Sequence, residues 1–107
     1  MLLGGPKMRL KVSVDPRKIA GFCRRHHVEK LSFFGSVLRK DFRSDSDVDV
    51  LVEFEPGHSV GLIRMAGLEI ELSEIIGRKV DLRTPAELSR YFRQDVLRYA
   101  QVQYAQR

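Results

Sequence analysis

Four residues near the middle of the chain have the types and spacing of a phosphate- and metal-binding site. Gly35 and Ser36 end a short apolar segment, and Asp47 and Asp49 follow after ten residues, which gives the pattern G-S-x10-D-x-D. A glycine lets a phosphate approach the backbone closely, and a serine in a turn offers it a hydroxyl and an amide. Strand residues two apart point the same way with their Cα atoms about 6 to 7 Å apart, so both aspartates can bind a pair of Mg²⁺ ions. The pattern predicts a two-metal site.

A third carboxylate is expected at the same site. Asp81 stands between Val80 and Leu82 in a short apolar segment. If this segment is a strand, Asp81 faces away from the core, as Asp47 and Asp49 do. We therefore expect three aspartates on neighbouring strands to form one site.

The hydrophobic pattern predicts helices and strands that position these residues. We expect a helix from Asp15 to about His27, strands at 28–34 and 47–54, a helix at 60–76, a strand at 79–83, and a helix from Thr84 onward with one break near Gln94. Asp15 before Pro16 and the Thr84, Pro85 and Glu87 capping box are the start signals of the first and last helices. The fold class is therefore α/β (α+β), a small mixed sheet of three or more strands flanked by helices.

Length and composition limit the alternatives. A chain of 107 residues with 43% hydrophobic residues forms one domain, which we place at 15–107, with 1–14 as an N-terminal extension or edge strand. Its single cysteine, Cys23, excludes an internal disulfide. No apolar run approaches the roughly 20 residues that span a bilayer, so we expect no membrane segment and a cytoplasmic location.

The charges favour an anionic partner such as a nucleotide. The formal net charge is +5, but five acids lie between positions 45 and 55 with no basic residue among them. Carboxylates this close repel one another, and a bound cation is a common way to stabilise such a cluster. The chain is also too short to carry a second domain for an acceptor substrate, so we expect a partner protein to bring its own binding surface.

Three segments carry a family resemblance: G-S-V-L-R at 35–39, D-S-D-V-D-V-L-V-E-F at 45–54 and G-R-K-V-D-L at 77–82. They resemble the minimal nucleotidyltransferases of the DNA polymerase β superfamily, and especially the MntA-type antitoxins that pair with HEPN-domain toxins. The resemblance covers about residues 15–105. It implies a polymerase-β-like fold and transfer of AMP from ATP to a tyrosine hydroxyl of a HEPN toxin, in a hetero-oligomeric toxin–antitoxin pair.

The resemblance also implies roles for the residues of the glycine–serine segment. Gly35 and Ser36 match the residues that hold the triphosphate in the family, and Arg39 matches an arginine that steadies phosphate charge. This chain has Leu38 where a small residue is usual and Lys40 where glycine is usual. These two departures concern the backbone shape of the loop.

By the same resemblance, the aspartates are the catalytic and metal-binding residues. Asp47 and Asp49 match the pair that binds both Mg²⁺ ions. Asp81 matches the carboxylate that binds the catalytic metal and helps to activate the acceptor hydroxyl.

Other functions are open from the sequence. The protein could neutralise a partner by binding alone, with weak or no catalysis, although three mutually repelling aspartates would bring a pure binder no benefit. Nucleic-acid binding through the basic surface is a weaker alternative, because no recognised binding motif supports it.

Two further groups have both a functional and a structural interpretation. One is the basic and aromatic segment of the last helix, which is either a docking face or has its aromatic rings in the core: Arg90, Tyr91, Phe92, Arg93, Arg98 and Tyr99. The other is Cys23, His26 and His27, which resembles a zinc-binding set but is more simply explained by a core cysteine at a helix end. Glu69, within the apolar stripe of its helix, needs a partner if it is buried.

Overall fold

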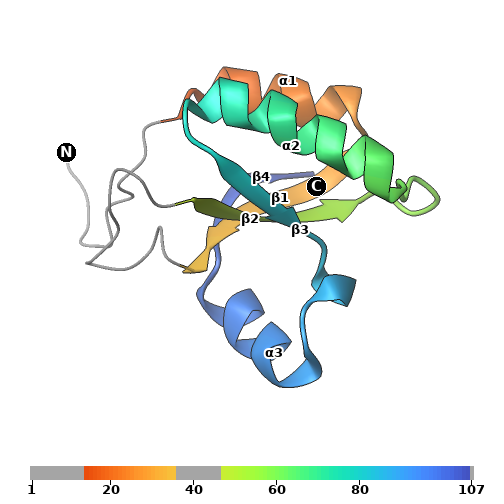
Figure 1. Ribbon diagram of the computed structural model, residues 1–107, viewed down its shortest axis with the longest axis vertical. Helices are drawn as coiled ribbons and strands as arrows, with labels where there is room; N and C mark the ends of the chain where they lie inside the picture. The colour runs from red at the N-terminus through yellow and green to blue at the C-terminus, as the bar shows by residue number, and fades with distance from the viewer. Residues whose placement is uncertain (1–13, 36–46, 107) are drawn as a thin grey trace.

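The computed structural model describes residues 14–35 and 47–106, except the side chain of Tyr91, and shows a four-stranded sheet with helices on both faces (Figure 1). Its elements are α1 (Pro16–Arg25), β1 (Val28–Phe34), β2 (Val48–Phe54), α2 (Leu62–Ile76), β3 (Val80–Arg83), a short 3-10 helix (Pro85–Glu87), α3 (Arg90–Tyr99) and β4 (Gln101–Ala105). The predicted α/β class with a small mixed sheet is confirmed.

The strands lie in the order β3-β2-β1-β4. β1 is antiparallel to both β2 and β4, whereas β2 and β3 are parallel. A parallel pair needs a crossover connection, and α2 supplies it between β2 and β3. The end of β1 and the starts of β2 and β3 therefore lie together at one end of the sheet.

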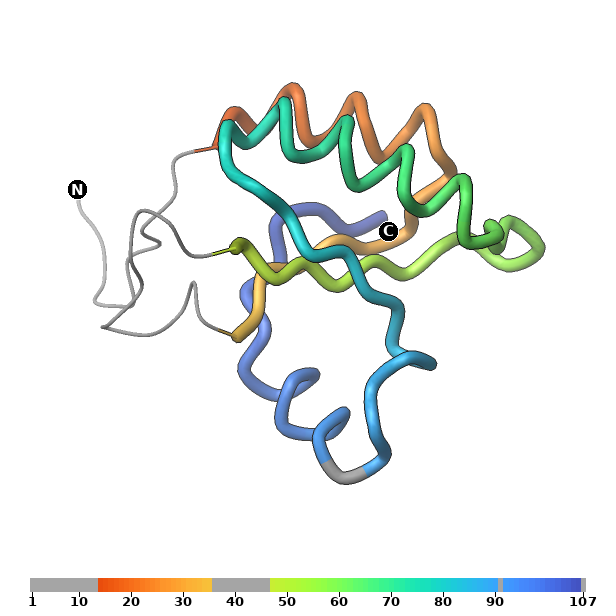
Figure 2. Tube along the Cα trace, viewed as in Figure 1, coloured from red at the N-terminus to blue at the C-terminus, as the bar shows by residue number. Residues whose placement is uncertain are grey.

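α1 and α2 cover one face of the sheet and α3 lies on the other (Figure 2). Asp15 caps α1 by accepting a hydrogen bond from the backbone amide of Arg17 at 2.9 Å, and Pro16 occupies the first turn, as predicted. α2 ends at Gly77, which takes a left-handed conformation with φ 80° that glycine adopts without strain. α1 and α2 run side by side above the strands.

Apolar residues alternate along the strands and pack on both faces. Val48, Val50 and Val52 face α1 and α2, as expected, and Leu51 faces α3. The core on the α1/α2 face consists of Ile19, Phe22, Cys23, Val28, Leu31, Phe33, Val48, Val50, Val52, Leu68, Leu72, Ile76, Val80 and Leu82. A smaller cluster on the α3 face consists of Phe34, Leu51, Leu88 and Val96.

The C-terminal third differs from the prediction in two ways. The break in the last helix lies at Leu88–Ser89 and not near Gln94, because the capping box closes only one 3-10 turn and Ser89 then caps α3 by accepting from the Phe92 amide. A fourth strand, β4, follows Ala100 and pairs with β1, where no strand was predicted. β4 is an edge strand whose Val102 is half exposed, so its hydrophobic alternation is weak.

Within the described part of the chain, no helix has the length and apolar character needed to cross a membrane.

Candidate functional site

Gly35, Asp49 and Asp81 come together at the end of the sheet where β1 finishes. In the β2–β3 pair, Asp49 lies directly beside Asp81, and in the β1–β2 pair it lies beside Phe34, the residue before Gly35. Parallel neighbours in register point their side chains to the same face about 4.8 Å apart. The sheet register therefore places two of the three predicted carboxylates next to each other.

Gly35 is the residue that lets Asp49 occupy this position. Its φ of 70° lies in the left-handed region, and a Cβ on this residue would overlap the Oδ2 atom of Asp49. Both features exclude larger side chains. The glycine of the sequence pattern thus leaves room for the second aspartate of the same pattern, Asp49.

The remaining predicted residues are placed differently. Asp47 is exposed and immediately precedes β2. Ser36 and Arg39 lie outside the described residues, as do Leu38 and Lys40. Among the described residues, the three aspartates do not form a group whose ligand atoms all lie within 4.8 Å of one another.

Arg83 is a site residue that the sequence analysis missed. Its Nε donates to Oδ1 of Asp81 at 3.1 Å, and its terminal nitrogen NH2 donates to Oδ2 at 3.3 Å. This hydrogen bond and the charge of Asp81 raise the pKa of Arg83 above its ordinary value; slight burial opposes the shift, and the charges of Glu87 and Asp49 add to it. A signal was present in the sequence, because Arg83 follows Asp81 by two residues in a strand and so shares its face.

The α2 helix fixes the edge strand that carries Asp81. The Val80 amide donates to Oγ of Ser73 at 3.0 Å, and the Leu82 amide donates to Oε2 of Glu69 at 2.8 Å. β3 is the outermost strand on this side, so these amides face away from β2 and have no strand to pair with. Glu69 therefore has the partner that its position required, and its role is to hold β3 in place.

A cleft of about 390 Å³ opens beside the paired aspartates. Its lining comes from the ends of β1, β2 and β3, from the 3-10 helix and from α3: Phe34, Gly35, Asp49, Asp81, Arg83, Glu87, Leu88 and Phe92. A second hollow of about 200 Å³ continues from Phe34 and Phe92 along α3 to Tyr99. The carboxylates thus lie at one side of a groove whose other side is apolar and aromatic.

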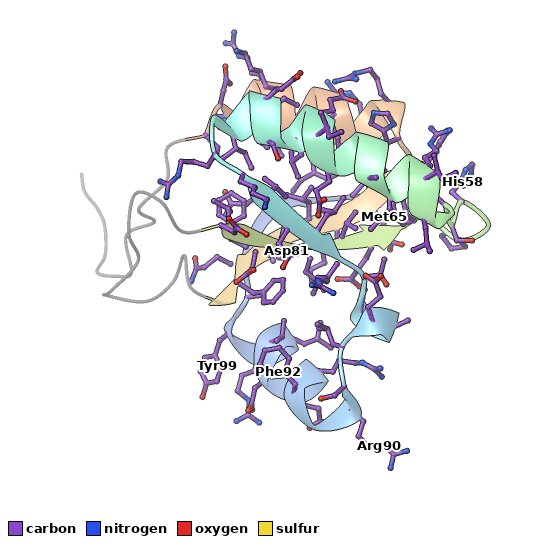
Figure 3. All side chains as sticks on the ribbon, viewed as in Figure 1. His58, Met65, Asp81, Arg90, Phe92 and Tyr99 are labelled. Atoms are coloured by element: carbon purple, nitrogen blue, oxygen red, sulfur yellow. The ribbon has the colours of Figure 1, made fainter. Side chains whose placement is uncertain are left out.

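Two aromatic residues of α3, Phe92 and Tyr99, are not in the core, and the Tyr91 side chain lies outside the described residues. Phe92 is 52% exposed and Tyr99 is 64% exposed, and Figure 3 shows both rings on α3 below the strand that bears Asp81. For these two residues the core interpretation is wrong. An exposed pair of rings beside the groove is available to a ligand or to a partner.

The zinc interpretation of Cys23, His26 and His27 is wrong. Cys23 is fully buried in the core, and this burial raises the pKa of its thiol from 9.0 to about 12, with Arg24 opposing the shift. His26 lies 2.9 Å from Oε1 of Glu71 through its Nε2. His27 contacts other side chains: its Nδ1 lies 3.5 Å from Oε1 of Glu55, and its ring stacks on the ring of His58.

A protein family match identifies the kind of domain in which this groove lies. A model described as the nucleotidyltransferase domain matches residues 16–103, which include the whole sheet apart from the last residues of β4. The chain belongs to the nucleotidyltransferase family. The groove and its paired carboxylates are therefore part of an enzyme fold, as the resemblance implied.

Two archaeal relatives of this nucleotidyltransferase carry more specific names. A Methanocaldococcus jannaschii protein assigned as a protein adenylyltransferase is 37% identical over 75 residues, which cover 70% of this chain and 78% of the relative. The protein adenylyltransferase MntA of Thermococcus cleftensis is 38% identical over 74 residues, covering 69% and 73%. The predicted membership of the minimal nucleotidyltransferases is confirmed.

Solved structures share the fold. One assigned as a minimal nucleotidyltransferase has a TM-score of 0.65 at 36% identity and covers 79% of this chain and 85% of its own. A chain of a complex between a tri-AMPylated HEPN toxin of Shewanella oneidensis and an MNT antitoxin has a TM-score of 0.61 at 20% identity, covering 85% and 70%. At that identity the second match shows the fold alone.

Proposed function

We propose that this nucleotidyltransferase is a protein adenylyltransferase that moves AMP from ATP to a tyrosine hydroxyl of a HEPN-domain toxin, as the antitoxin of the pair. The observation that carries the proposal is the position of Asp49 and Asp81. They lie side by side on neighbouring strands, next to Gly35 and along the groove. The relatives' names and the AMPylated toxin of the related complex support the choice of nucleotide and acceptor. We assign the activity to residues 15–107 and expect it in the cytoplasm, where ATP is available.

The donor chemistry of the site fits magnesium. Asp47, Asp49 and Asp81 offer only carboxylate oxygens, the hard ligands that Mg²⁺ prefers together with substrate phosphates. When bound, the two Mg²⁺ ions would supply charge neutralisation at the triphosphate and a lowered pKa of the acceptor hydroxyl. Asp81 would hold the catalytic ion and orient the hydroxyl, and Asp47 and Asp49 would serve both ions.

The other residues of the groove would bind and orient the substrates. Gly35 and Ser36 are proposed to bring the backbone to the phosphates, with Arg39 as a positive charge. Arg83 neutralises Asp81 while no metal is bound, and its planar set of donors suits a phosphate oxygen once a metal competes for Asp81.

The acceptor would approach over α3. Phe92 and Tyr99 expose their rings next to the groove, and Arg98 is exposed on the same helix. Aromatic and arginine side chains are the types most enriched in protein interfaces. We therefore propose that this face meets the toxin and brings its tyrosine to the carboxylates.

The test is transfer to the cognate toxin, measured by intact mass. The protein is incubated with the toxin, Mg²⁺ and each nucleoside triphosphate in turn, beside the variants Asp47→Asn and Glu74→Gln. Glu74 is an exposed acid on α2, outside the groove, and serves as the matched control. We expect the toxin to gain the mass of AMP with wild type and with Glu74→Gln, and none with Asp47→Asn.

A second function, neutralisation by binding alone, is favoured by two observations. The three aspartates are not gathered within 4.8 Å, and Arg83 already engages both oxygens of Asp81. In that case the toxin would form a stable complex, lose its activity, and show no mass gain with any nucleotide. This outcome would overturn the proposed transfer.

A further inference from the structure

A second group of metal-ligating side chains lies at the opposite end of the β1–β2 pair. β1 and β2 are antiparallel and seven residues long, so Gly35 and Asp49 mark one end of the pair, and His27 and Glu55 mark the other. Seven strand residues extend about 20 Å. Figure 3 shows His58 in the connection that leads to α2, far along the sheet from Asp81. This group is separate from the proposed transfer site.

The group consists of two imidazoles and one carboxylate whose ligand atoms all lie within 4.8 Å of one another: His27, Glu55 and His58. Oε1 of Glu55 is 3.5 Å from Nδ1 of His27 and 3.9 Å from Nε2 of His58. The two rings stack with their centroids 4.0 Å apart and an interplanar angle of 16°. Three potential ligand atoms from two segments of the chain thus lie close together.

The backbone holds these three residues in position. His27 has a φ of 57°, an uncommon conformation for a residue with a side chain, and its carbonyl accepts from the Glu55 amide at 2.9 Å. The His58 amide in turn donates to the Glu55 carbonyl at 3.0 Å. The cluster is therefore held where the α1–β1 turn lies beside the start of the β2–α2 connection.

The carboxylate is oriented by a fourth residue. The side-chain amide of Gln106 donates to Oε2 of Glu55 and to the Val28 carbonyl, which leaves Oε1 directed at the two histidines. This hydrogen bond is the main cause that lowers the pKa of Glu55; desolvation opposes it, and the charge and hydrogen bond of His27 and the charge of His58 add to it. A metal-ligating carboxylate is commonly held in this way by an outer hydrogen bond.

We propose that His27, Glu55 and His58 form a binding site for a Zn²⁺-class divalent metal ion. Zinc binds imidazole nitrogen and carboxylate oxygen at about 2.0 to 2.2 Å with tetrahedral geometry, which puts neighbouring ligand atoms about 3.3 to 3.5 Å apart. The 3.5 and 3.9 Å from Oε1 of Glu55 to the two imidazole nitrogens are close to this spacing. The fourth position is open to water or to a ligand from another molecule.

The chemistry of this site differs from that of the aspartates. Two imidazoles select zinc and similar transition metals, whereas an all-carboxylate set suits Mg²⁺. An ion here would link the start of β1 to the β2–α2 connection and, through Gln106, to the end of β4. We expect it to stabilise the fold at this end and to leave nucleotide transfer unchanged.

The test uses the three histidines of the chain as separate reporters. The imidazole nitrogens of the ¹⁵N-labelled protein are followed by NMR during a titration with ZnCl₂ in excess Mg²⁺, which occupies the carboxylate site. We expect zinc to shift Nδ1 of His27 and Nε2 of His58. His26 pairs with Glu71 and has no second histidine in its group, so its signals should stay in place.

Two variants and one control complete the test. His58→Gln and Glu55→Gln each remove a ligand from an exposed turn, and we expect at least a tenfold loss of zinc affinity in calorimetry. His26→Gln should bind zinc as the wild type does. Zinc should also raise the Tm of the wild type and not that of His58→Gln.

Three results would overturn the site. These are unshifted His27 and His58 nitrogens at saturating zinc, equal affinity in His58→Gln and wild type, or a signal confined to His26. Each would show that the cluster is an ion-paired turn without metal affinity.

Discussion

On the α1/α2 side of the sheet, fourteen of the described residues form one buried apolar cluster, whereas on the α3 side only four do. The two faces alternate along the same strand, so Val50 and Leu51 are neighbours in β2 but belong to different clusters. Asp49 and Asp81 share the face of Leu51. The large cluster stabilises the fold, and the thinly covered face leaves room for charged groups and a groove.

This division has a physical reason. Like charges next to each other cost free energy, and a groove removes apolar surface that could have been buried. Such costs are tolerated where the opposite face supplies most of the burial. We therefore expect substitutions on the α1/α2 face to change mainly the free energy of unfolding, and substitutions on the α3 face to change mainly activity or ligand binding.

The largest effect on stability is expected for Val50→Asp. Val50 is completely buried among the helices, and an unpaired carboxylate there would cost more than about 4 kcal/mol, a large share of a small domain's stability. The variant should show no cooperative thermal unfolding in circular dichroism. Asp49→Asn, one residue earlier on the other face, is the control and should melt at or above the wild-type temperature. A native-like melt of Val50→Asp would contradict the division of the faces.

Leu72→Ala and Leu88→Ala compare the two clusters with the same substitution. Leu72 is fully buried on the α1/α2 face, and its truncation should cost about 3 to 4 kcal/mol in urea unfolding. Leu88 lies in the small cluster and lines the groove, so its truncation should cost about 2 kcal/mol. At a temperature where both variants are folded, Leu88→Ala should nevertheless reduce AMP transfer more than Leu72→Ala does. Equal loss of transfer in both variants would show that the α3 face has no special role.

Glu69→Ala tests how the stable face positions the site. The variant leaves the Leu82 amide without its acceptor, which we expect to cost about 1 to 2 kcal/mol. Because β3 carries Asp81, Mg²⁺ affinity should fall together with stability. Ser73→Ala frees the Val80 amide, on the other side of Asp81, and should lower stability and Mg²⁺ affinity in the same way. If Glu69→Ala left the Mg²⁺ affinity unchanged, the contact between α2 and β3 would have no part in positioning Asp81.

Much of this arrangement could be predicted from the sequence because it depends on local patterns. The cap at Asp15, the stop at Gly77 and the alternation of valines in β2 define elements through interactions within a few residues. The same alternation placed Asp49 and Asp81 on one face before their register was known.

What the sequence did not reveal depends on contacts between distant segments. β4 is stabilised by pairing with β1 about seventy residues earlier, and its own pattern is weak. The Glu55–Gln106 contact and the approach of His58 to His27 likewise join segments whose proximity only the strand pairing creates. Arg83 could have been found by applying the strand period to a basic residue as well as to the acids.

Arg83→Gln should have the smallest effect on stability and a clear effect on metal binding. The Arg83 side chain is 50% exposed and that of Asp81 is 36% exposed, so losing the pair should cost less than about 0.5 kcal/mol. Removing a positive charge next to Asp81 should raise the affinity for a divalent ion about three- to tenfold in the absence of nucleotide. This can be measured with Mn²⁺ by electron paramagnetic resonance. Arg90→Gln removes the same charge from a side chain that Figure 3 shows pointing away from Asp81, and it should bind Mn²⁺ as the wild type does. If both variants bound Mn²⁺ more tightly, the effect would come from net charge, and the pairing of Arg83 with Asp81 would have no part in tuning the site.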